Sequence, residues 1–438
     1  MAVDGGGTTA SETERQSVYR KVSWRIIPLL MLCYMAAYLD RVNIGFAKLQ
    51  MSSDLAFSDA VFGLGAGIFF IGYVLFEVPS NLILERVGAK LWIARIMVTW
   101  GLISACFVFV QTPMHFYVLR FLLGVAEAGF YPGVILYLTY WYPANRRARI
   151  IATFTAAIAL SGVIGGPLSG WILQSMSGVM GWAGWKWMFF IEAMPSLILG
   201  VVILLWLDDN PDKARWLNAA ERRVLLKDLA EDRKGTIAHA SVFSLMRDAR
   251  IWRLSAIYAS YVMGLYGLAF WMPTMVRASG VTSSLYVGFL TAIPYACAVV
   301  AMIALGTVAD RTGRTRGCVA GALFVGAVGL AACVPAAHNA PALMVMLCVV
   351  ACGILSAPSV FWKMPTAMLS GMSAAAGIAL INAIGNIGGF ASPYLLGWLN
   401  TLTGDTSIGI YLLSAIMAAG AICALTTKLQ GGESVDRH

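Results

Sequence analysis

Four charged residues lie inside long apolar stretches of this 438-residue chain. Asp40 and Arg41 are adjacent in an apolar run that extends from about residue 26 to residue 47. Arg120 and Glu127 lie seven residues apart in another run, and since seven residues make about two helical turns, both side chains project from one helix face. A charge deep in a membrane helix costs roughly 2.5–3.5 kcal/mol on insertion scales, so it is retained where it faces a protein interior or a watery cavity. The four residues therefore predict a polar functional site inside a membrane protein.

The residue types indicate what chemistry this site performs. The planar guanidinium of Arg41 can hold a carboxylate with two parallel hydrogen bonds and does not lose its charge. Asp40 and Glu127 are carboxylic acids in a low-dielectric setting beside arginines, an arrangement in which carboxyl groups bind and release protons. Arg120 is the expected counter-ion when either acid is charged. The alternative for each of the four charges is a structural ion pair.

The elements that must position these residues are transmembrane helices. The chain is 59% hydrophobic and only 12% charged, with a mean hydropathy of +0.75. Such values predict an all-α polytopic membrane protein rather than a soluble one. Twelve apolar runs predict about twelve transmembrane helices, near residues 26–47, 61–84, 91–111, 114–141, 148–174, 186–207, 252–276, 285–309, 317–336, 341–369, 374–399 and 407–427.

Six runs precede and six follow a polar segment, so we expect two bundles joined by a linker. The predicted organisation is a polar N-terminal tail at 1–23, an N-terminal six-helix bundle at 24–207, a linker at 208–250, a C-terminal six-helix bundle at 251–428 and a C-terminal tail at 429–438.

The distribution of basic residues predicts the orientation. If both termini lie in the cytoplasm, 25 of the 31 Lys and Arg fall at cytoplasmic ends and loops, as the positive-inside rule requires. The net charge of +9 then reflects topology and is no sign of nucleic-acid binding. No cleavable signal is evident, and we expect a multi-pass protein of the cell (inner) membrane.

The two halves of the chain repeat one another. Glu85-Arg86-x-Gly88 recurs as Asp310-Arg311-x-Gly313 with an offset of 225 residues, and Pro167 recurs as Pro393 with an offset of 226. Offsets that agree to within one residue, with the same sense across the membrane, indicate a parallel repeat of two six-helix halves. Glycines in the fifth and eleventh runs predict close helix packing, at Gly162, Gly165, Gly166, Gly170, Gly385, Gly388, Gly389 and Gly397.

Several motifs resemble those of a known family. The loop Gly306-x-x-Ala-Asp310-Arg311-x-Gly313-Arg314-x-Arg316 resembles the signature of the major facilitator superfamily. Further stretches resemble its anion:cation symporter family, especially the tartrate, phthalate and hydroxyphenylacetate permeases. They are Leu39-Asp40-Arg41-Val42-Asn43, Arg120-Phe-Leu-Leu-Gly124-x-x-Glu127-Ala-Gly129-x-x-Pro132, Trp141-Tyr-Pro143, Phe76-Glu77-Val78-Pro79-Ser80-Asn81 and Phe361-Trp362-x-x-Pro365.

This resemblance implies a fold of two six-helix bundles and a proton-coupled symporter. In galactonate-type relatives, the positions that match Asp40 and Glu127 carry protons, and the position that matches Arg41 binds substrate. The first-half copy of the signature is degenerate, with Glu85 in place of the usual Asp.

Polar and aromatic residues are expected to complete the substrate pocket. Tyr38 precedes Arg41 by one turn, and Tyr73 precedes Glu77 by four residues. We interpret Glu77 as one member of a structural pair near the inner gate. The resemblance places three residues of the second half opposite these tyrosines: Ser359, Trp362 and Asn382. Asn386 lies one turn beyond Asn382. Lys363 would add a cation from the second half, suited to a dicarboxylate. The alternatives are packing for Trp362 and a lysine that snorkels to the membrane surface for Lys363.

The sequence thus predicts a secondary transporter that imports a small organic anion with protons by alternating access. We expect no cofactor beyond the coupling protons, no nucleic-acid partner, contact with the lipid bilayer, and a monomer. One rival is an exporter or antiporter of the same fold, and a second is a membrane sensor that binds the anion without transport. An enzyme is disfavoured, because the chain has no HExxH or GxSxG motif and only four dispersed histidines.

Overall fold

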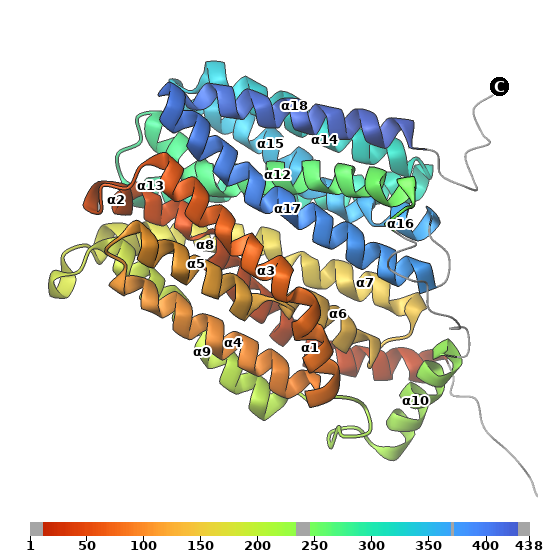
Figure 1. Ribbon diagram of the computed structural model, residues 1–438. Coiled ribbons are helices and arrows are strands. Elements are labelled where there is room, and N and C mark those ends of the chain that lie inside the picture. Colours follow the sequence, from red (N-terminus) through yellow and green to blue (C-terminus); the bar gives the residue numbers. More distant parts are fainter. Residues whose placement is uncertain (1–11, 234–245, 369–371, 428–438) are drawn as a thin grey trace, which may run out of the picture.

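The computed structural model describes residues 12–233, 246–368 and 372–427, which fold almost entirely into helices (Figure 1). Within these ranges, twelve helices, some of them interrupted, are long and apolar enough to cross a membrane, which confirms the expected number of spans. In chain order they are α1 with α2 (Glu12–Val42, Ile44–Asp54), α3 (Asp59–Val87), α4 with η1 (Ala89–Ala105, Cys106–Phe109), α5 with α6 (Pro113–Glu127, Phe130–Thr139), α7 with α8 (Ala144–Thr155, Ala157–Ser175), α9 (Gly184–Trp206), α12 (Ala249–Ala278), α13 (Ser284–Thr312), α14 (Thr315–Ala336), α15 with α16 (Ala340–Phe361, Lys363–Met368), α17 (Met372–Thr403) and α18 (Thr406–Thr426).

The molecule has two polar ends. The end that carries the linker helix α10 (Ala219–Arg233) is called the linker face, and the opposite end, beside α2, the far face (Figure 1). Five helices that start at the far face are capped by side-chain oxygens, which accept hydrogen bonds from otherwise unpaired backbone N–H groups of the first turn. The capping residues are Ser58, Thr112, Ser283, Asn339 and Asp405.

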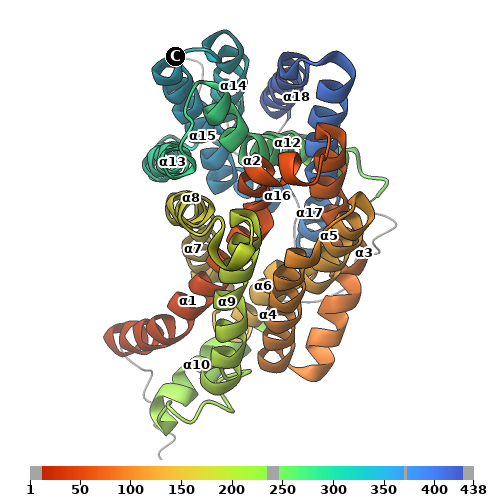
Figure 2. The same ribbon diagram turned by 90° about the vertical axis from the view of Figure 1, so that its left-hand side faces the viewer.

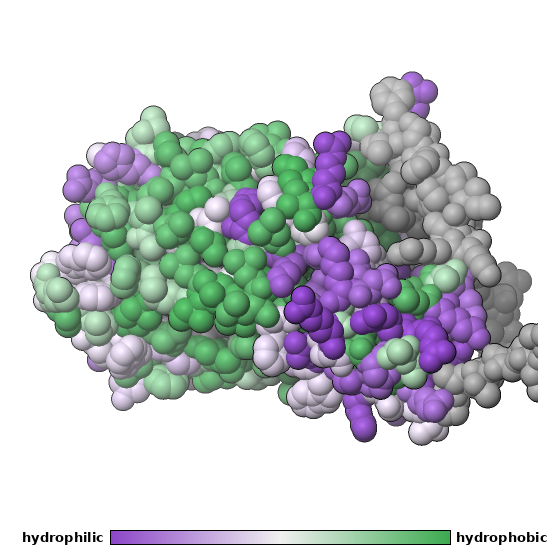
Figure 3. Space-filling model, turned by 90° about the horizontal axis from the view of Figure 1, so that it is seen from below, coloured by the Kyte–Doolittle hydropathy of each residue, from purple (hydrophilic) through white to green (hydrophobic). Residues whose placement is uncertain are grey.

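Between the two ends the surface is apolar. Large hydrophobic side chains are exposed along the middle of the helices, among them Ile198, Val300, Ile303 and Phe324. Figure 3 shows this apolar belt, with hydrophilic residues gathered toward the ends. A belt of this kind is stable against lipid chains and unstable in water, as expected for a multi-pass membrane protein.

The helices form two bundles, one from α1–α9 and one from α12–α18 (Figure 2). The bundles pack together chiefly through α8 against α13 and α3 against α17. Backbones approach closely there, since a Cβ atom on Gly288 would lie 2.3 Å from the carbonyl oxygen of Gly166, and one on Gly397 would lie 2.2 Å from that of Asp59. The predicted role of the glycines in close packing is confirmed for Gly166 and Gly397.

Polar contacts also join the bundles at the far face. Asp59 at the start of α3 accepts a hydrogen bond from Asn400 of α17, and Lys48 pairs with the same carboxylate at 2.7 Å. Gln174 at the end of α8 accepts hydrogen bonds from the Ser283 hydroxyl (2.6 Å) and from the Leu285 backbone (3.1 Å). The structure is therefore closed at the far face.

The linker helix α10 docks on the N-terminal bundle. Asp228 accepts a hydrogen bond from the Tyr19 hydroxyl at 3.1 Å, Lys21 pairs with Glu221 at 2.8 Å, and Arg147 pairs with Asp232 at 3.2 Å. These contacts explain why residues 12–23, predicted as part of a polar tail, instead continue helix α1 toward the linker. The remaining residues of the two predicted tails, 1–11 and 429–438, lie outside the described part of the chain.

Candidate functional site

Arg41 lies where the first span is interrupted. Helix α1 ends at Val42 and α2 begins at Ile44, so the guanidinium projects from the C-terminal end of α1, where the helix dipole favours a cation. Only 8% of Arg41 is exposed. One nitrogen, Nη2, forms an ion pair with Glu127, and the other, Nη1, donates a hydrogen bond to the Tyr266 hydroxyl at 2.6 Å. Arg41 therefore connects the two bundles, because Tyr266 belongs to α12.

Glu127 also lies at a helix interruption. It is the last residue of α5, is 1% exposed, and precedes a break at Ala128 and Gly129. Gly129 has φ +85°, in the left-handed region that favours glycine, and a Cβ atom there would lie 2.3 Å from the Ser80 hydroxyl oxygen. Broken helices of this type mark binding sites in transporters, because the interruption turns side chains and helix ends toward the centre of the protein.

Asp40 has a different environment from Glu127. Its carboxylate accepts three hydrogen bonds from the same bundle, from Trp100 Nε1 (2.9 Å), Ser104 (3.0 Å) and Ser196 (2.8 Å). In the part of the chain that the structure describes, no lysine or arginine pairs with Asp40. The two adjacent residues thus face different ways: Arg41 points to the interface between the bundles and Asp40 into the N-terminal bundle.

Arg120 does not form the predicted ion pair with either acid. It is fully buried and donates hydrogen bonds to the carbonyl oxygens of Gly65 (3.1 Å) and Ala66 (3.3 Å) in α3. The reason is geometric, because seven helical residues span about 10 Å, so Arg120 lies well toward the far face from Glu127. Glu127 instead forms its ion pair with Arg41. The Phe69 ring lies beside both guanidinium groups. Its centre is 5.0 Å from the guanidinium carbon of Arg120 and 5.2 Å from that of Arg41.

The tyrosines expected near Arg41 are both buried close to it. The centre of the Tyr73 ring lies 5.3 Å from the Arg41 guanidinium, so this residue lines the site. Tyr38 is 1% exposed and lies beside Tyr295 of α13, on the interface between the bundles. Phe70 packs against Tyr266 with a ring separation of 4.5 Å. Aromatic side chains from both bundles therefore surround the Arg41 guanidinium.

A second polar cluster lies on the linker side of Arg41. The Asn382 amide of α17 donates a hydrogen bond to Glu77 of α3 at 3.2 Å and accepts one from the Tyr258 hydroxyl at 3.3 Å. The Tyr258 ring lies 4.9 Å from the ring of Trp362. Asn382 and Trp362 are thus brought together, as expected. The interpretation of Glu77 as one half of a structural pair is corrected, since its hydrogen-bond partner is an amide of the other bundle.

The remaining residues predicted for the second half are less closely associated with the site. The Ser359 hydroxyl donates to the Ser356 carbonyl of its own helix at 2.6 Å, and Asn386 is half-buried one turn beyond Asn382. Lys363 departs from the substrate-binding prediction. It follows the end of α15 at Phe361, pairs with Asp310 at the end of α13, and is 43% exposed in its side chain. This position matches the alternative of a lysine at the membrane surface.

Some residues around the site were missed by the sequence reasoning. Trp100, Ser104 and Ser196 are ordinary polar or aromatic residues within apolar runs and give no signal of their own. Tyr266 could have been found, because it follows Arg41 by 225 residues, the offset of the internal repeat. Residues at equivalent positions of two halves meet when both face the axis between the halves, as Arg41 and Tyr266 do.

Comparison with known proteins decides the family. Residues 30–393 match the model of the Major Facilitator Superfamily, which is most of the chain. The chain belongs to the major facilitator superfamily. This is a family of membrane transporters and not of enzymes. A relative named "Putative tartrate transporter" from Agrobacterium vitis is 48% identical over 98% of this chain and 95% of its own length.

Two further comparisons agree with this assignment. A protein named "Putative metabolite transport protein NicT" from Pseudomonas putida is 45% identical over 98% of this chain and 99% of its own. Among solved structures, a bacterial homologue of the human lysosomal transporter Spinster is similar with a TM-score of 0.70 at 17% identity, covering 95% of this chain and 96% of that one. At this identity the structural likeness supports the fold alone.

Proposed function

We propose that this transporter is a proton-coupled symporter that imports a small organic anion. The observation that carries the proposal is the buried ion pair between Arg41 and Glu127, which lies at two interrupted helices and beside the interface between the bundles. Arg41 is the cation best placed to bind a substrate carboxylate, and in the structure its guanidinium is paired with the carboxylate of Glu127.

Competition for Arg41 gives a physical reason for coupling. A substrate carboxylate that takes the guanidinium leaves Glu127 as a buried, unpaired charge, which is strongly unfavourable. A proton on Glu127 removes that charge and releases Arg41. The anion and the proton therefore favour each other's binding, and this mutual preference is what a symporter requires.

Asp40 is a second site that protons could use. Its three partners are neutral donors, and a carboxyl group held by neutral donors in a buried place can exist in either protonation state. With one proton per monoanion the transport step is electroneutral, and each pH unit supplies about 1.4 kcal/mol. A second proton would add a net positive charge and about 2.3 kcal/mol per 100 mV of membrane potential.

The surroundings suggest a carboxylate that carries further polar groups. Arg41 offers one charged anchor, while Asn382, Tyr258 and Glu77 offer an amide, a phenol and a carboxyl group on the linker side of it. A sugar acid, a tartrate-like dicarboxylate or an aromatic acid with a hydroxyl group would fit such a set. The name of the Agrobacterium vitis relative, a tartrate transporter, agrees with this class. Lys363 pairs with Asp310 and adds no second cation to this set.

In this proposal the linker face is cytoplasmic, because it corresponds to the side on which the sequence predicts 25 of the 31 Lys and Arg. The protein is then a multi-pass protein of the inner membrane, closed toward the outside in the present structure. The two bundles rock about the site near Arg41 to expose it to either side in turn. Residues of one chain make up the whole site, so a monomer suffices.

The proposal is tested in two steps with purified protein. A thermal-shift screen against sugar acids, tartrate, phthalate and hydroxyphenylacetate identifies a ligand that stabilises the fold. Uptake of that ligand is then measured in proteoliposomes with an alkaline interior. Accumulation above the external concentration supports inward symport. An exporter or antiporter would accumulate the ligand only with an acidic interior, and a sensor would bind it without uptake.

A further inference from the structure

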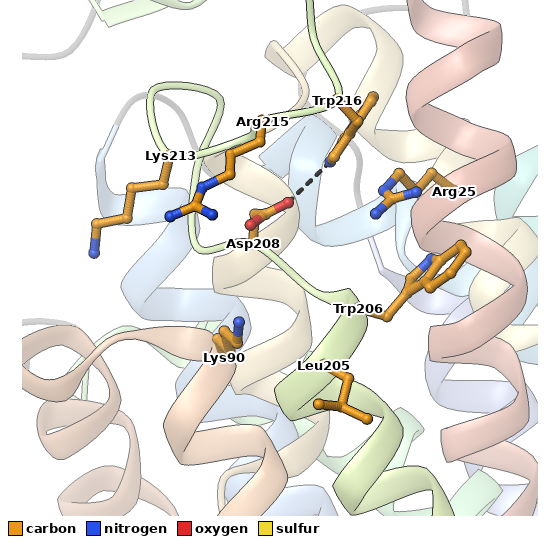
Figure 4. A pocket seen from close by; sticks show the side chains of 8 residues that line it. All are labelled: Arg25, Lys90, Leu205, Trp206, Asp208, Lys213, Arg215 and Trp216. Atoms are coloured by element: carbon orange, nitrogen blue, oxygen red, sulfur yellow. Dashed lines mark hydrogen bonds between the residues drawn. The ribbon is translucent and has the colours of Figure 1, made fainter.

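A cavity of about 880 Å³ opens on the linker face and plays no part in the transport site. It lies between α1, the start of α4, the end of α9 and the first part of the linker (Figure 4). Four cations and one acid line it together with apolar and aromatic side chains: Arg25, Lys90, Leu205, Trp206, Asp208, Lys213, Arg215 and Trp216.

Positive charge in this cavity is not balanced by its acids. Asp208 accepts a hydrogen bond from Trp216 at 2.9 Å, and Lys213 pairs with the neighbouring Asp209 at 3.0 Å. Within the described ranges, Arg25, Lys90 and Arg215 form no ion pair. The single carboxylate of Asp208 cannot balance these three cations, so the cavity carries a net positive charge and an anion bound between the cations is stabilised.

Arg25 is the best-defined of these cations. Its guanidinium lies 4.3 Å from the centre of the Trp206 ring and 5.0 Å from that of Trp216, so two aromatic faces hold it. Its Nε is buried yet has no hydrogen-bond partner. A buried donor without a partner is costly, and a bound oxyanion would satisfy it.

The walls of the cavity are fixed by contacts beneath them. Trp216 stacks on the buried Trp141 ring at 5.8 Å with an angle of 11° between the planes. The Tyr137 hydroxyl donates to the Asp208 carbonyl at 2.8 Å, and Asp209 accepts from the Lys90 backbone at 3.0 Å. The linker segment is therefore held against the N-terminal bundle, and the site is preformed.

One side of the cavity is apolar and exposed. Leu205 is 79% exposed and Trp206 is 51% exposed at the end of α9, and Trp24, the neighbour of Arg25, is 76% exposed. Tryptophans at the end of a span lie at the level of lipid head groups. The cavity thus has cations on its aqueous side and an apolar wall that continues onto the lipid-facing surface.

From this arrangement we propose that the cavity binds the phosphodiester head group of an anionic phospholipid. Arg25, Lys90 and Arg215 surround the phosphate, and an acyl chain lies along Leu205 and the exposed surface of α9. Free inorganic phosphate has the same charge chemistry but gains nothing from the apolar wall. Since the linker is one wall of the cavity, the lipid also holds the linker on the N-terminal bundle.

Native mass spectrometry of the delipidated full-length protein tests the proposal. The protein is titrated with phosphatidylglycerol or phosphatidylcholine, and the first bound lipid is quantified. We expect a preference for phosphatidylglycerol that the pair Arg25→Gln with Arg215→Gln weakens by about tenfold or more. The matched control is Arg20→Gln with Arg253→Gln, which removes the same charge from two exposed arginines outside the cavity and should keep the preference.

Other results would overturn the proposal. One is equal binding of the two lipids by wild type. Another is an unchanged preference for phosphatidylglycerol in the Arg25 and Arg215 double variant. A third is an equal loss of that preference in this double variant and in the control. Displacement of the lipid by millimolar inorganic phosphate would show a site for soluble anions instead. If the double variant does not fold, as judged by its melting temperature, Lys90→Gln alone is measured, and it should weaken the preference in the same direction.

Discussion

The substitution Glu127→Gln tests the proposed competition for Arg41. Glutamine keeps the shape of the side chain and removes its charge, so Arg41 loses its counter-ion. The two side chains are 9% and 1% exposed, which places them among buried pairs and not among surface pairs. Removing one partner of a buried pair costs about 3–5 kcal/mol, because the other charge remains uncompensated.

A substrate carboxylate that binds Arg41 restores the missing charge. We therefore expect Glu127→Gln to melt at a lower temperature than wild type without substrate, and to gain more stability from substrate. Its affinity should also lose much of its dependence on pH. Wild-type affinity should fall by about tenfold per pH unit as pH rises through the range in which Glu127 titrates, since each anion then requires one proton.

The assay combines thermal shift and titration calorimetry at a series of pH values, with counterflow and accumulation in proteoliposomes. Glu127→Gln should bind substrate and exchange it in counterflow, yet fail to accumulate it under a pH gradient. Glu231→Gln, the same exchange on the exposed surface of α10, is the matched control and should behave as wild type. If the affinity of Glu127→Gln falls with pH as steeply as that of wild type, Glu127 is not the coupling acid and Asp40 must carry that role.

Three further predictions concern the cations and the far face. Arg41→Lys should recover little of the binding lost in Arg41→Ala, because a point charge cannot replace a planar fork, and near-normal affinity in Arg41→Ala would remove Arg41 from the site. Lys363→Ala should affect monocarboxylates and dicarboxylates equally, since Lys363 pairs with Asp310 on the surface; a selective loss of dicarboxylate binding would contradict this placement. Cysteines at Gln174 and Ser283 should form a disulfide that stops uptake until it is reduced, and unaltered uptake by the fully cross-linked protein would show that the far face need not open.

Much of the fold could be predicted because membrane spans follow from length and apolarity alone. The break at Asn43 and the break after Glu127 were not foreseen, although both adjoin the residues singled out for their charge. A short interruption changes neither hydropathy nor length, so periodicity gives no sign of it. The repeat offset, in contrast, carries three-dimensional information, as the contact of Arg41 with Tyr266 shows.

The partners of the charges could not be predicted from helix spacing. Arg120 and Glu127 share a face, but a shared face does not place two side chains at the same depth. Contact of Glu127 with Arg41 depends on how α1 crosses α5, which the sequence does not encode locally. Glu77 illustrates the same limit, because its partner Asn382 lies 305 residues away in the other bundle.

The central claim is that substrate and proton move together, and proton flux measures it directly. Proteoliposomes are prepared with a pH-sensitive dye inside, with equal pH on both sides and the membrane potential clamped at zero. An inward substrate gradient should acidify the interior with wild-type protein and should leave it unchanged with Glu127→Gln. Substrate entry without acidification in wild type, measured in the same vesicles with labelled substrate, would contradict the account.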